Sequence, residues 1–326
     1  MKIIQTLLVL LGGLFPFILN AGTTEDIYFS HIGMEDGLSH STIFAINQDK
    51  EGNLWFATYD GVNKYDGYNF TVYRHEYANP NSIASDITRC IAIDDSDQIW
   101  VGTREGLSFY NRRKNSFSNY YYKKNGINVP INSIAPIKEN WLMLGTAEGI
   151  LLFDIKKECF LNDTLPSLHL LKPTVLVRQG EYIYIGAEDG VYTYTLSGGK
   201  LERLVSMPAG IRIHAILFSR IWMATEGDGL FMYDAKTKEL KNYRYESEQS
   251  GLNSNYVRSL ELDTENRLWV GTYSGLNIYK EATDNFSSIK SSEIQEGSLS
   301  QNSVRSIFKD SQGGMWLGTY WGGLNY

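Results

Sequence analysis

Short apolar runs alternate with polar turns along most of the chain. A typical stretch has the run "VRSLEL" (257–262), the polar turn "DTENR" (263–267) and the phrase "LWVGTYSGLNIY" (268–279), then "FSSI" (286–289). No long segment shows a sustained apolar stripe with a 3.6-residue period. The pattern therefore predicts short strands joined by tight turns rather than helices.

The same phrase occurs seven times in register. The spacings between its anchor positions are 45, 43, 41, 38, 47 and 47 residues. This period is typical of four-stranded propeller blades and not of shorter helical or leucine-rich repeats. The anchors are Trp55, Trp100, Met143, Tyr184, Trp222, Trp269 and Trp316.

Each copy contains four predicted strands, and its residue types suit a blade. A large Trp fills the gap between neighbouring blades and has one N–H to satisfy. Glycines such as Gly102 and Gly271 let backbone approach backbone near a crowded centre. The glycine that closes the turn between the second and third strands, here named the second turn, suits a positive φ. These closing glycines are Gly61, Gly106, Gly149, Gly190, Gly229, Gly275 and Gly323.

The two ends of the chain complement each other. The seventh copy stops at Tyr326 after its third strand, whereas "IYFSHI" (27–32) precedes the first copy and resembles the fourth strand at 286–289. The following linkers, 35–43 and 296–304, also correspond. We therefore predict an all-β fold: a seven-bladed β-propeller of four-stranded antiparallel blades, closed by an N-terminal strand that completes the last blade.

The first 21 residues differ from the rest. One Lys precedes an apolar run over 3–19, and small residues follow it, as in a secretory signal peptide. An uncleaved membrane anchor is the alternative. Residues 22–326 are then a single propeller domain, and we expect a periplasmic location. Cys90 and Cys159 fit no disulfide scaffold, and we predict two buried free thiols.

Charge and motifs exclude several classes of function. The net charge is −7 and no Lys/Arg-rich run occurs, so nucleic acid is not an expected partner. The five His show no metal-ligand spacing, and we predict no metal site, cofactor or catalytic residue. His214 lies in an apolar strand and is interpreted as a core histidine. Since distances between carboxylates on different blades cannot be read from the sequence, a glycosidase stays open.

The phrase at 268–279, with "GLNSNYVRSLELDTENR" (251–267) before it, resembles the two-component regulator propeller repeat. The resemblance covers 27–326; the third and fourth copies lack Trp, and the fourth has Ala187 where Thr is usual. It implies the periplasmic sensor region of a bacterial hybrid two-component histidine kinase. Such relatives often sense glycan breakdown products. We expect an excerpt of such a sensor, or a stand-alone propeller, without the kinase.

Antiparallel order in a blade puts the second turns and the loops between blades on one face. There we expect a central funnel lined by aromatic and charged side chains, which suit a sugar because rings stack on it and charged groups bind hydroxyls. Alternatively, exposed turns simply prefer such residues. The predicted ligand-binding residues are Tyr59, Asp60, Arg104, Glu105, Glu226, Asp228, Tyr273, Tyr320 and Trp321, with Glu148, Glu188 and Asp189 also in these turns.

The expected function is ligand sensing without catalysis, with an oligosaccharide or another small periplasmic molecule as ligand. The alternatives are a secreted polysaccharide lyase or hydrolase and a protein-docking scaffold. A second propeller or a second copy of the chain is a further expected partner. Membrane contact is expected only through the N-terminal segment or through regions beyond this sequence.

Overall fold

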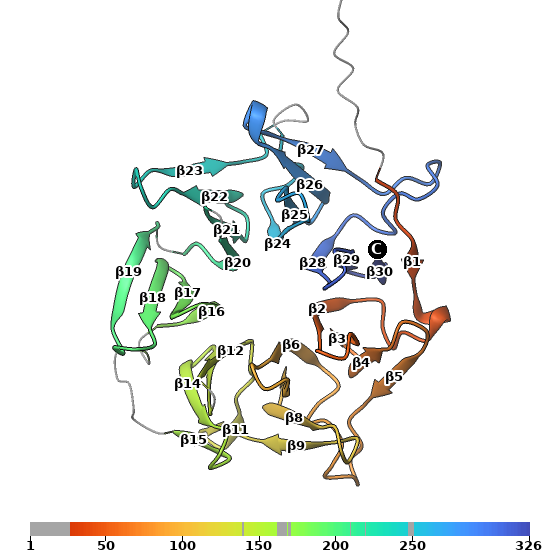
Figure 1. Cartoon of the computed structure of the whole chain (residues 1–326), viewed down its shortest axis with the longest axis vertical. Helices are drawn as coiled ribbons and strands as arrows, with labels where there is room; N and C mark the ends of the chain where they lie inside the picture. Colours follow the sequence, from red (N-terminus) through yellow and green to blue (C-terminus); the bar gives the residue numbers. More distant parts are fainter. Residues whose placement is uncertain are drawn as a thin grey trace, which may run out of the picture.

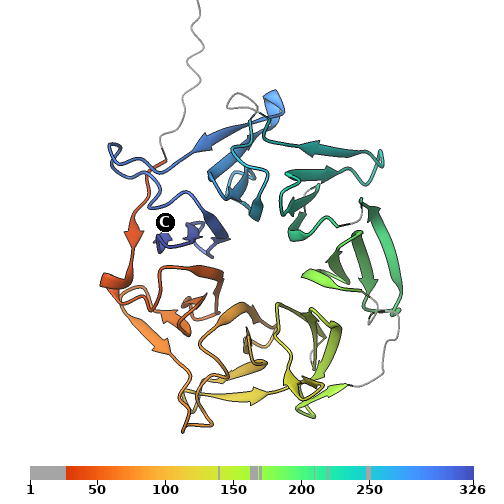
Figure 2. The same ribbon diagram turned by 180° about the vertical axis from the view of Figure 1, so that it is seen from behind.

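Seven antiparallel sheets surround a central axis, as predicted (Figure 1). The computed structural model describes residues 27–138, 140–161, 168, 171–208, 210–218, 220–246 and 251–326. The predicted signal peptide or anchor (1–21) lies outside these residues. Viewed from behind, the first strand of each blade again lies nearest the axis and the fourth at the rim (Figure 2).

The blades follow chain order, and each has four strands. Blade 1 contains β2 (Ile43–Gln48), β3 (Leu54–Thr58), β4 (Val62–Tyr65) and β5 (Phe70–Tyr73). Blade 2 contains β6 (Thr88–Ile93), β7 (Ile99–Thr103), β8 (Leu107–Asn111) and β9 (Ser116–Tyr120). Blade 3 contains β12 (Ser133–Lys138), β13 (Trp141–Thr146), β14 (Gly149–Asp154) and β15 (Cys159–Leu161). Blade 4 contains β16 (Pro173–Gln179), β17 (Tyr182–Ala187), β18 (Gly190–Thr195) and β19 (Leu201–Ser206).

The remaining blades have the same order. Blade 5 contains β20 (Ile213–Phe218), β21 (Ile221–Thr225), β22 (Leu230–Tyr233) and β23 (Leu240–Tyr243). Blade 6 contains β24 (Val257–Leu262), β25 (Leu268–Thr272), β26 (Gly275–Lys280) and β27 (Asn285–Ile289). Blade 7 contains β28 (Val304–Lys309), β29 (Met315–Thr319), β30 (Leu324–Asn325) and the N-terminal β1 (His31–Ile32). A small hairpin of β10 (Lys123–Lys124) and β11 (Ile127–Asn128) follows blade 2.

The two termini close the ring, as predicted, and the paired segments β1 and β30 are here named the latch. In the β1–β30 pair, His31 lies opposite Asn325 and Ile32 opposite Leu324. The Ser30 and Tyr326 backbones exchange two hydrogen bonds of 2.8 and 3.0 Å. The regular strand is shorter than the predicted 27–32, because the Phe29 N–H bonds to the Gly297 carbonyl, 2.8 Å away in a loop, and not to β30.

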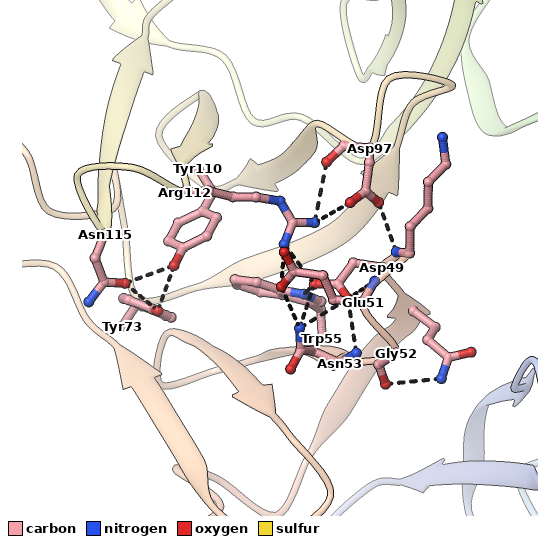
Figure 3. Close-up of polar contacts among 12 residues, drawn as sticks. Asp49, Glu51, Gly52, Asn53, Trp55, Tyr73, Asp97, Tyr110, Arg112 and Asn115 are labelled. Carbon is pink, nitrogen blue, oxygen red and sulfur yellow. Dashed lines mark hydrogen bonds and ion pairs between the residues drawn. The ribbon is translucent and has the colours of Figure 1, made fainter.

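An aspartate holds the Trp of four blades in place. In blade 1 the Trp55 indole N–H donates to Asp49 Oδ2, 2.9 Å away, and the Asn53 N–H donates to Oδ1 of the same carboxylate (Figure 3). One carboxylate thus closes the turn between the first two strands and satisfies the buried indole. The same pairs are Asp94–Trp100, Asp263–Trp269 and Asp310–Trp316.

The second turns also repeat one hydrogen-bond pattern. In blade 1 the Thr58 hydroxyl donates to the Gly61 carbonyl at 2.9 Å, and five other blades have the same bond. Blade 4 has Ala187 at this place and lacks the hydroxyl. All seven closing glycines have positive φ, between 71° and 153°, which confirms their predicted role.

Two local predictions need correction. Both cysteines are free, but Cys159 is exposed, because it begins the outer strand β15; Cys90 is half-buried on the inner strand β6. Backbone does approach Gly102, where an added Cβ would lie 2.9 Å from the Ile131 carbonyl oxygen. The space beside Gly271, however, is filled by side chains: an added Cβ would clash with Ser259 Oγ and lie 2.8 Å from Val304 Cγ1.

Candidate functional site

In six of the seven blades, a β-bulge turns one side chain of the innermost strand toward the axis. In six blades the pairing of the first and second strands shifts by one residue directly after the first pair; in β24, for example, Val257 pairs with Thr272 and Ser259 with Gly271. The residue between has no partner, and such a bulge re-aims its side chain. In blade 3, Asn132 takes this place, with its N–H bonded to Gly145. These seven residues, here named the bulge ring, are Phe44, Arg89, Asn132, Thr174, His214, Arg258 and Arg305.

The bulge ring lines two adjoining cavities. The larger, of about 640 Å³ and here named the axial cavity, is lined by every member of the ring except Arg258. The smaller, of about 220 Å³ and here named the tyrosine pocket, is lined by Tyr59, Arg258, Tyr273, Ser303, Arg305 and Tyr320. Tyr59 and Arg305 contribute to both, so the two cavities meet beside blades 1 and 7.

The second turns lie on the same face as the loops between blades, as the strand order predicts. The Arg104 N–H donates to the Ile87 carbonyl at 2.9 Å, and the Tyr273 N–H donates to the Tyr256 carbonyl at 3.0 Å. The first residue of each turn points inward in several blades: Tyr59 and Glu188 line the axial cavity, and Tyr273 and Tyr320 line the tyrosine pocket.

In five blades, the next acidic residue of the turn pairs on the outer side instead. Asp60 accepts from Arg74, which follows the outer strand β5, at 2.9 Å; Asp228 accepts from Arg244, which follows β23, at 3.2 Å. Likewise Glu105 binds Asn128, Glu148 binds Lys124 and Asp189 binds Arg203. None of these five acids lines the axial cavity or the tyrosine pocket.

Three predicted residues, Arg104, Glu105 and Trp321, lie away from the axis or at its rim. Arg104 and Glu105 line a separate cavity of about 710 Å³ together with Tyr121. Trp321 has a φ of 77° and is 60% exposed. Its ring centroid lies 5.5 Å from that of His40 and 5.3 Å from that of Tyr320, so it continues the aromatic surface outward from the tyrosine pocket.

Glu226 is the shared acceptor of three basic side chains. Its carboxylate lies 3.4 Å from Arg258, 3.5 Å from His214 and 3.7 Å from Arg212. Burial, and then the charge of Arg258, lower the pKa of His214 despite the nearby carboxylate. The imidazole is therefore neutral at neutral pH, and the positive charge here belongs to the arginines.

The two cavities carry an excess of positive charge within an acidic chain. Five cationic side chains line them, namely Arg89, Lys172, Arg212, Arg258 and Arg305. Among the described residues, Glu188 is the single acid in either lining, and Glu226 lies behind the lining, where it pairs with Arg258 and Arg212. Since the whole chain has a net charge of −7, the funnel differs in sign from the rest of the molecule.

Most of the bulge ring was not predicted from the sequence. His214 is not a core histidine: it is half-buried and lines the axial cavity. A signal was available in the strands themselves. When the innermost strands are aligned, "TRC" (88–90), "IHA" (213–215) and "VRS" (257–259 and 304–306) all place a polar residue second in an apolar run.

The described ranges contain neither a candidate metal site nor a candidate membrane-spanning helix. No group of three or more His, Cys, Asp or Glu there could hold a metal ion. In the same part of the chain, no helix is long and apolar enough to cross a membrane.

Comparison with known proteins gives consistent matches. A family model described as "Two component regulator propeller" matches residues 37–60, 251–274 and 298–321. A curated relative, Histidine kinase P4 of Formosa agariphila, is 49% identical over 49 residues, which are 15% of this chain and 4% of that protein.

Two solved structures match nearly the whole propeller. The extracellular domain of the putative hybrid two component system BT3049 from B. thetaiotaomicron is 28% identical, with a TM-score of 0.75 over 92% of this chain and 41% of that one. The extracellular domain of BT4673 from the same organism is 25% identical, with a TM-score of 0.70 over 92% of this chain and 39% of that one. This chain therefore spans about two-fifths of those structures.

Proposed function

We propose, from the premise that this chain belongs to the two-component regulator propeller family, that it is an extracellular sensor propeller of a hybrid two-component system. The likeness to extracellular domains of two putative systems of this kind, each over 92% of this chain, supports the proposal. An apolar N-terminal run of the type that directs export supports a periplasmic location.

The ligand of the sensor is an oligosaccharide derived from a glycan, bound in the funnel. The carrying observation is that the bulge ring and the inward-facing turn tyrosines converge on adjoining cavities at the axis. A volume of about 640 Å³ falls within the usual range of small-molecule sites. Tyrosine faces can stack on the apolar faces of sugar rings, and guanidinium groups can donate to hydroxyls.

Sensing then requires two arrangements of the propeller relative to a second propeller or a second copy of the chain. Ligand in the funnel shifts their equilibrium only if it binds one arrangement more tightly. We assign no catalytic step to this segment.

A thermal-shift experiment tests ligand binding. The purified chain is heated with a panel of oligosaccharides at millimolar concentration, and a ligand at 100 times its Kd should stabilise the fold by about 2.7 kcal/mol. Tyr273→Ala should abolish the shift, whereas Tyr68→Ala, at an 89% exposed tyrosine in the turn between β4 and β5, should not. If no oligosaccharide raises the melting temperature, direct sensing is wrong.

The enzyme and scaffold alternatives give different results. A polysaccharide lyase or hydrolase would release products from the same panel, and Glu226→Gln would stop that release. A docking scaffold would retain a periplasmic protein in a pull-down and ignore every sugar.

A further inference from the structure

We infer that the funnel selects an acidic oligosaccharide, and that Arg258 and Arg305 in the tyrosine pocket bind a carboxylate or sulfate group on one of its sugar rings. The inference rests on the proposed function, because it names the class of ligand that the sensor takes.

Arg305 is the side chain that most clearly lacks an acidic partner. Within the described ranges, no carboxylate lies at ion-pair distance (4.0 Å) from it. Its guanidinium carbon lies 4.3 Å from the ring centroid of Phe44. Burial, and then repulsion from Arg258, lower its pKa. A half-buried cation without a counter-charge is costly, and an anionic ligand would remove that cost.

The arginines on the outer side of the same turns are arranged differently. Arg74, Arg203 and Arg244 each form an ion pair with an aspartate of their own blade. Their charge is thereby satisfied within the protein. By contrast, Arg305 at the axis has no carboxylate within 4.0 Å in the described part of the chain.

The tyrosine pocket has the volume and the side chains for one acidic sugar residue. Arg258 and Arg305 border a space of about 220 Å³ with three tyrosines and Ser303. Guanidinium groups bind carboxylate and sulfate oxygens in a bidentate manner, which a neutral hydroxyl cannot match. The guanidinium carbon of Arg258 also lies 5.9 Å from the Tyr273 ring centroid, so that ring contacts the cation and faces the pocket.

The axial cavity extends the same preference to neighbouring sugar residues. Arg89 is hydrogen-bonded to Asn132 Oδ1 at 2.5 Å, and the described part of the chain places no carboxylate within ion-pair distance of it. Lys172 and Arg212 add charge at the mouth. A chain with several acidic groups therefore finds more than one cationic contact.

Isothermal titration of the whole chain distinguishes the two sources of the anionic group. One arm uses uronic-acid oligosaccharides, a second uses sulfated neutral-sugar oligosaccharides, and a third uses unmodified neutral oligosaccharides of the same length. We expect one acidic arm to bind at least tenfold more tightly than the neutral arm, with an affinity that falls as salt is raised.

Arg305→Gln should lower the affinity for the acidic ligand at least tenfold and leave neutral ligands unchanged. Arg305→Lys, which keeps the charge but loses the fork, should recover part of the loss. Arg74→Gln is the matched control, because Arg74 lies on the same face but is paired with Asp60. Arg305→Gln should fold, since it removes a half-buried cation.

The outcomes separate this inference from the proposed function. If neutral and acidic oligosaccharides bind equally well and Arg305→Gln changes neither, the acidic preference is wrong while sugar sensing stands. If no arm binds, the proposed function itself is wrong, and this inference falls with it.

Discussion

At the scale of single residues, an aspartate in the first turn of four blades accepts hydrogen bonds both from a Trp indole and from backbone amides of the turn. Asp49 accepts from the indole of Trp55 with one oxygen and from turn amides with the other. Burial alone raises the pKa of Asp49, but hydrogen bonds from Trp55 and Asn53 outweigh it and the net pKa is lowered. In Figure 3, Arg112 of blade 2 also reaches this carboxylate, so one side chain stabilises a turn, a Trp and a contact between blades.

Asp49→Ala should therefore destabilise the fold by about 2–3 kcal/mol, because it leaves the buried indole N–H and two turn amides without an acceptor. Trp55→Phe breaks the same hydrogen bond by removing its donor, the indole N–H. In a double-mutant cycle measured by urea unfolding, the two changes should couple by about 1–2 kcal/mol. Additive losses would show that the bond contributes nothing specific.

The bulge-ring histidine should make stability depend on pH. Burial, then Arg258, lower the pKa of His214 below 6.5, and Glu226, Arg305 and Arg212 complete its charged surroundings. Below pH 6.5 the unfolded chain then binds more protons than the folded one, so stability falls as the pH falls. The free energy of unfolding, measured with urea at several pH values between 5 and 7.5, should fall less steeply with falling pH in His214→Gln than in the parent. Equal slopes would contradict the assignment.

At the scale of the blade, the first two strands match each other in size. Where the second strand has Gly, the residue opposite is larger, as in Ser259–Gly271 and Ser306–Gly318. Where Ala takes the place of that Gly, as in blades 1 and 5, the residue opposite is also Ala, in the pairs Ala45–Ala57 and Ala215–Ala224. The small space at this pair of positions is therefore filled either by one larger side chain on the first strand or by two alanine methyl groups, one from each strand.

Gly271→Ala should cost about 1–3 kcal/mol, since the new methyl group would meet Ser259 Oγ and Val304 Cγ1. Adding Ser259→Ala should recover most of the loss. The double variant reproduces the Ala–Ala pair of blade 5, which also has a valine, Val257, at the start of the next blade. A double variant less stable than Gly271→Ala alone, measured by thermal unfolding, would show that strand pairing does not set this size rule.

The repeats let the strands, turns and ring closure be predicted, because each blade states the same pattern again. For the bulge ring, the aligned repeats show a polar residue in the second position of several innermost strands, but they do not show which way its side chain points. A bulge inserts one residue into a strand without altering its composition, so alternation assigns Arg258 or Arg305 to the wrong face. The outward direction of Asp60 and Asp228 depends on the backbone path of a tight turn, which polarity alone does not reveal.

At the scale of the whole molecule, contacts between distant segments hold the ring together. On the face opposite the funnel, Arg178 of blade 4 forms an ion pair of 2.8 Å with Asp95 of blade 2. The closing contact joins the termini, with a two-residue strand and the buried side chain of Phe29 against Trp269 and Leu299. Few backbone bonds are formed there, so side-chain burial must supply much of the closing free energy.

Phe29→Ala should therefore open the ring selectively. Phe29 is 6% exposed between blades 6 and 7, and its truncation should cost about 3–4 kcal/mol. Tyr28→Ala is the matched control, because Tyr28 is 66% exposed and precedes the latch. In Phe29→Ala, amide hydrogen exchange should be faster in β1 and β30 but unchanged in blades 1 to 5, because the lost stability falls on the contact between the termini. If exchange rates rose equally in all seven blades, the blades would unfold as one unit, and the contact between the termini would not be the least stable part of the ring.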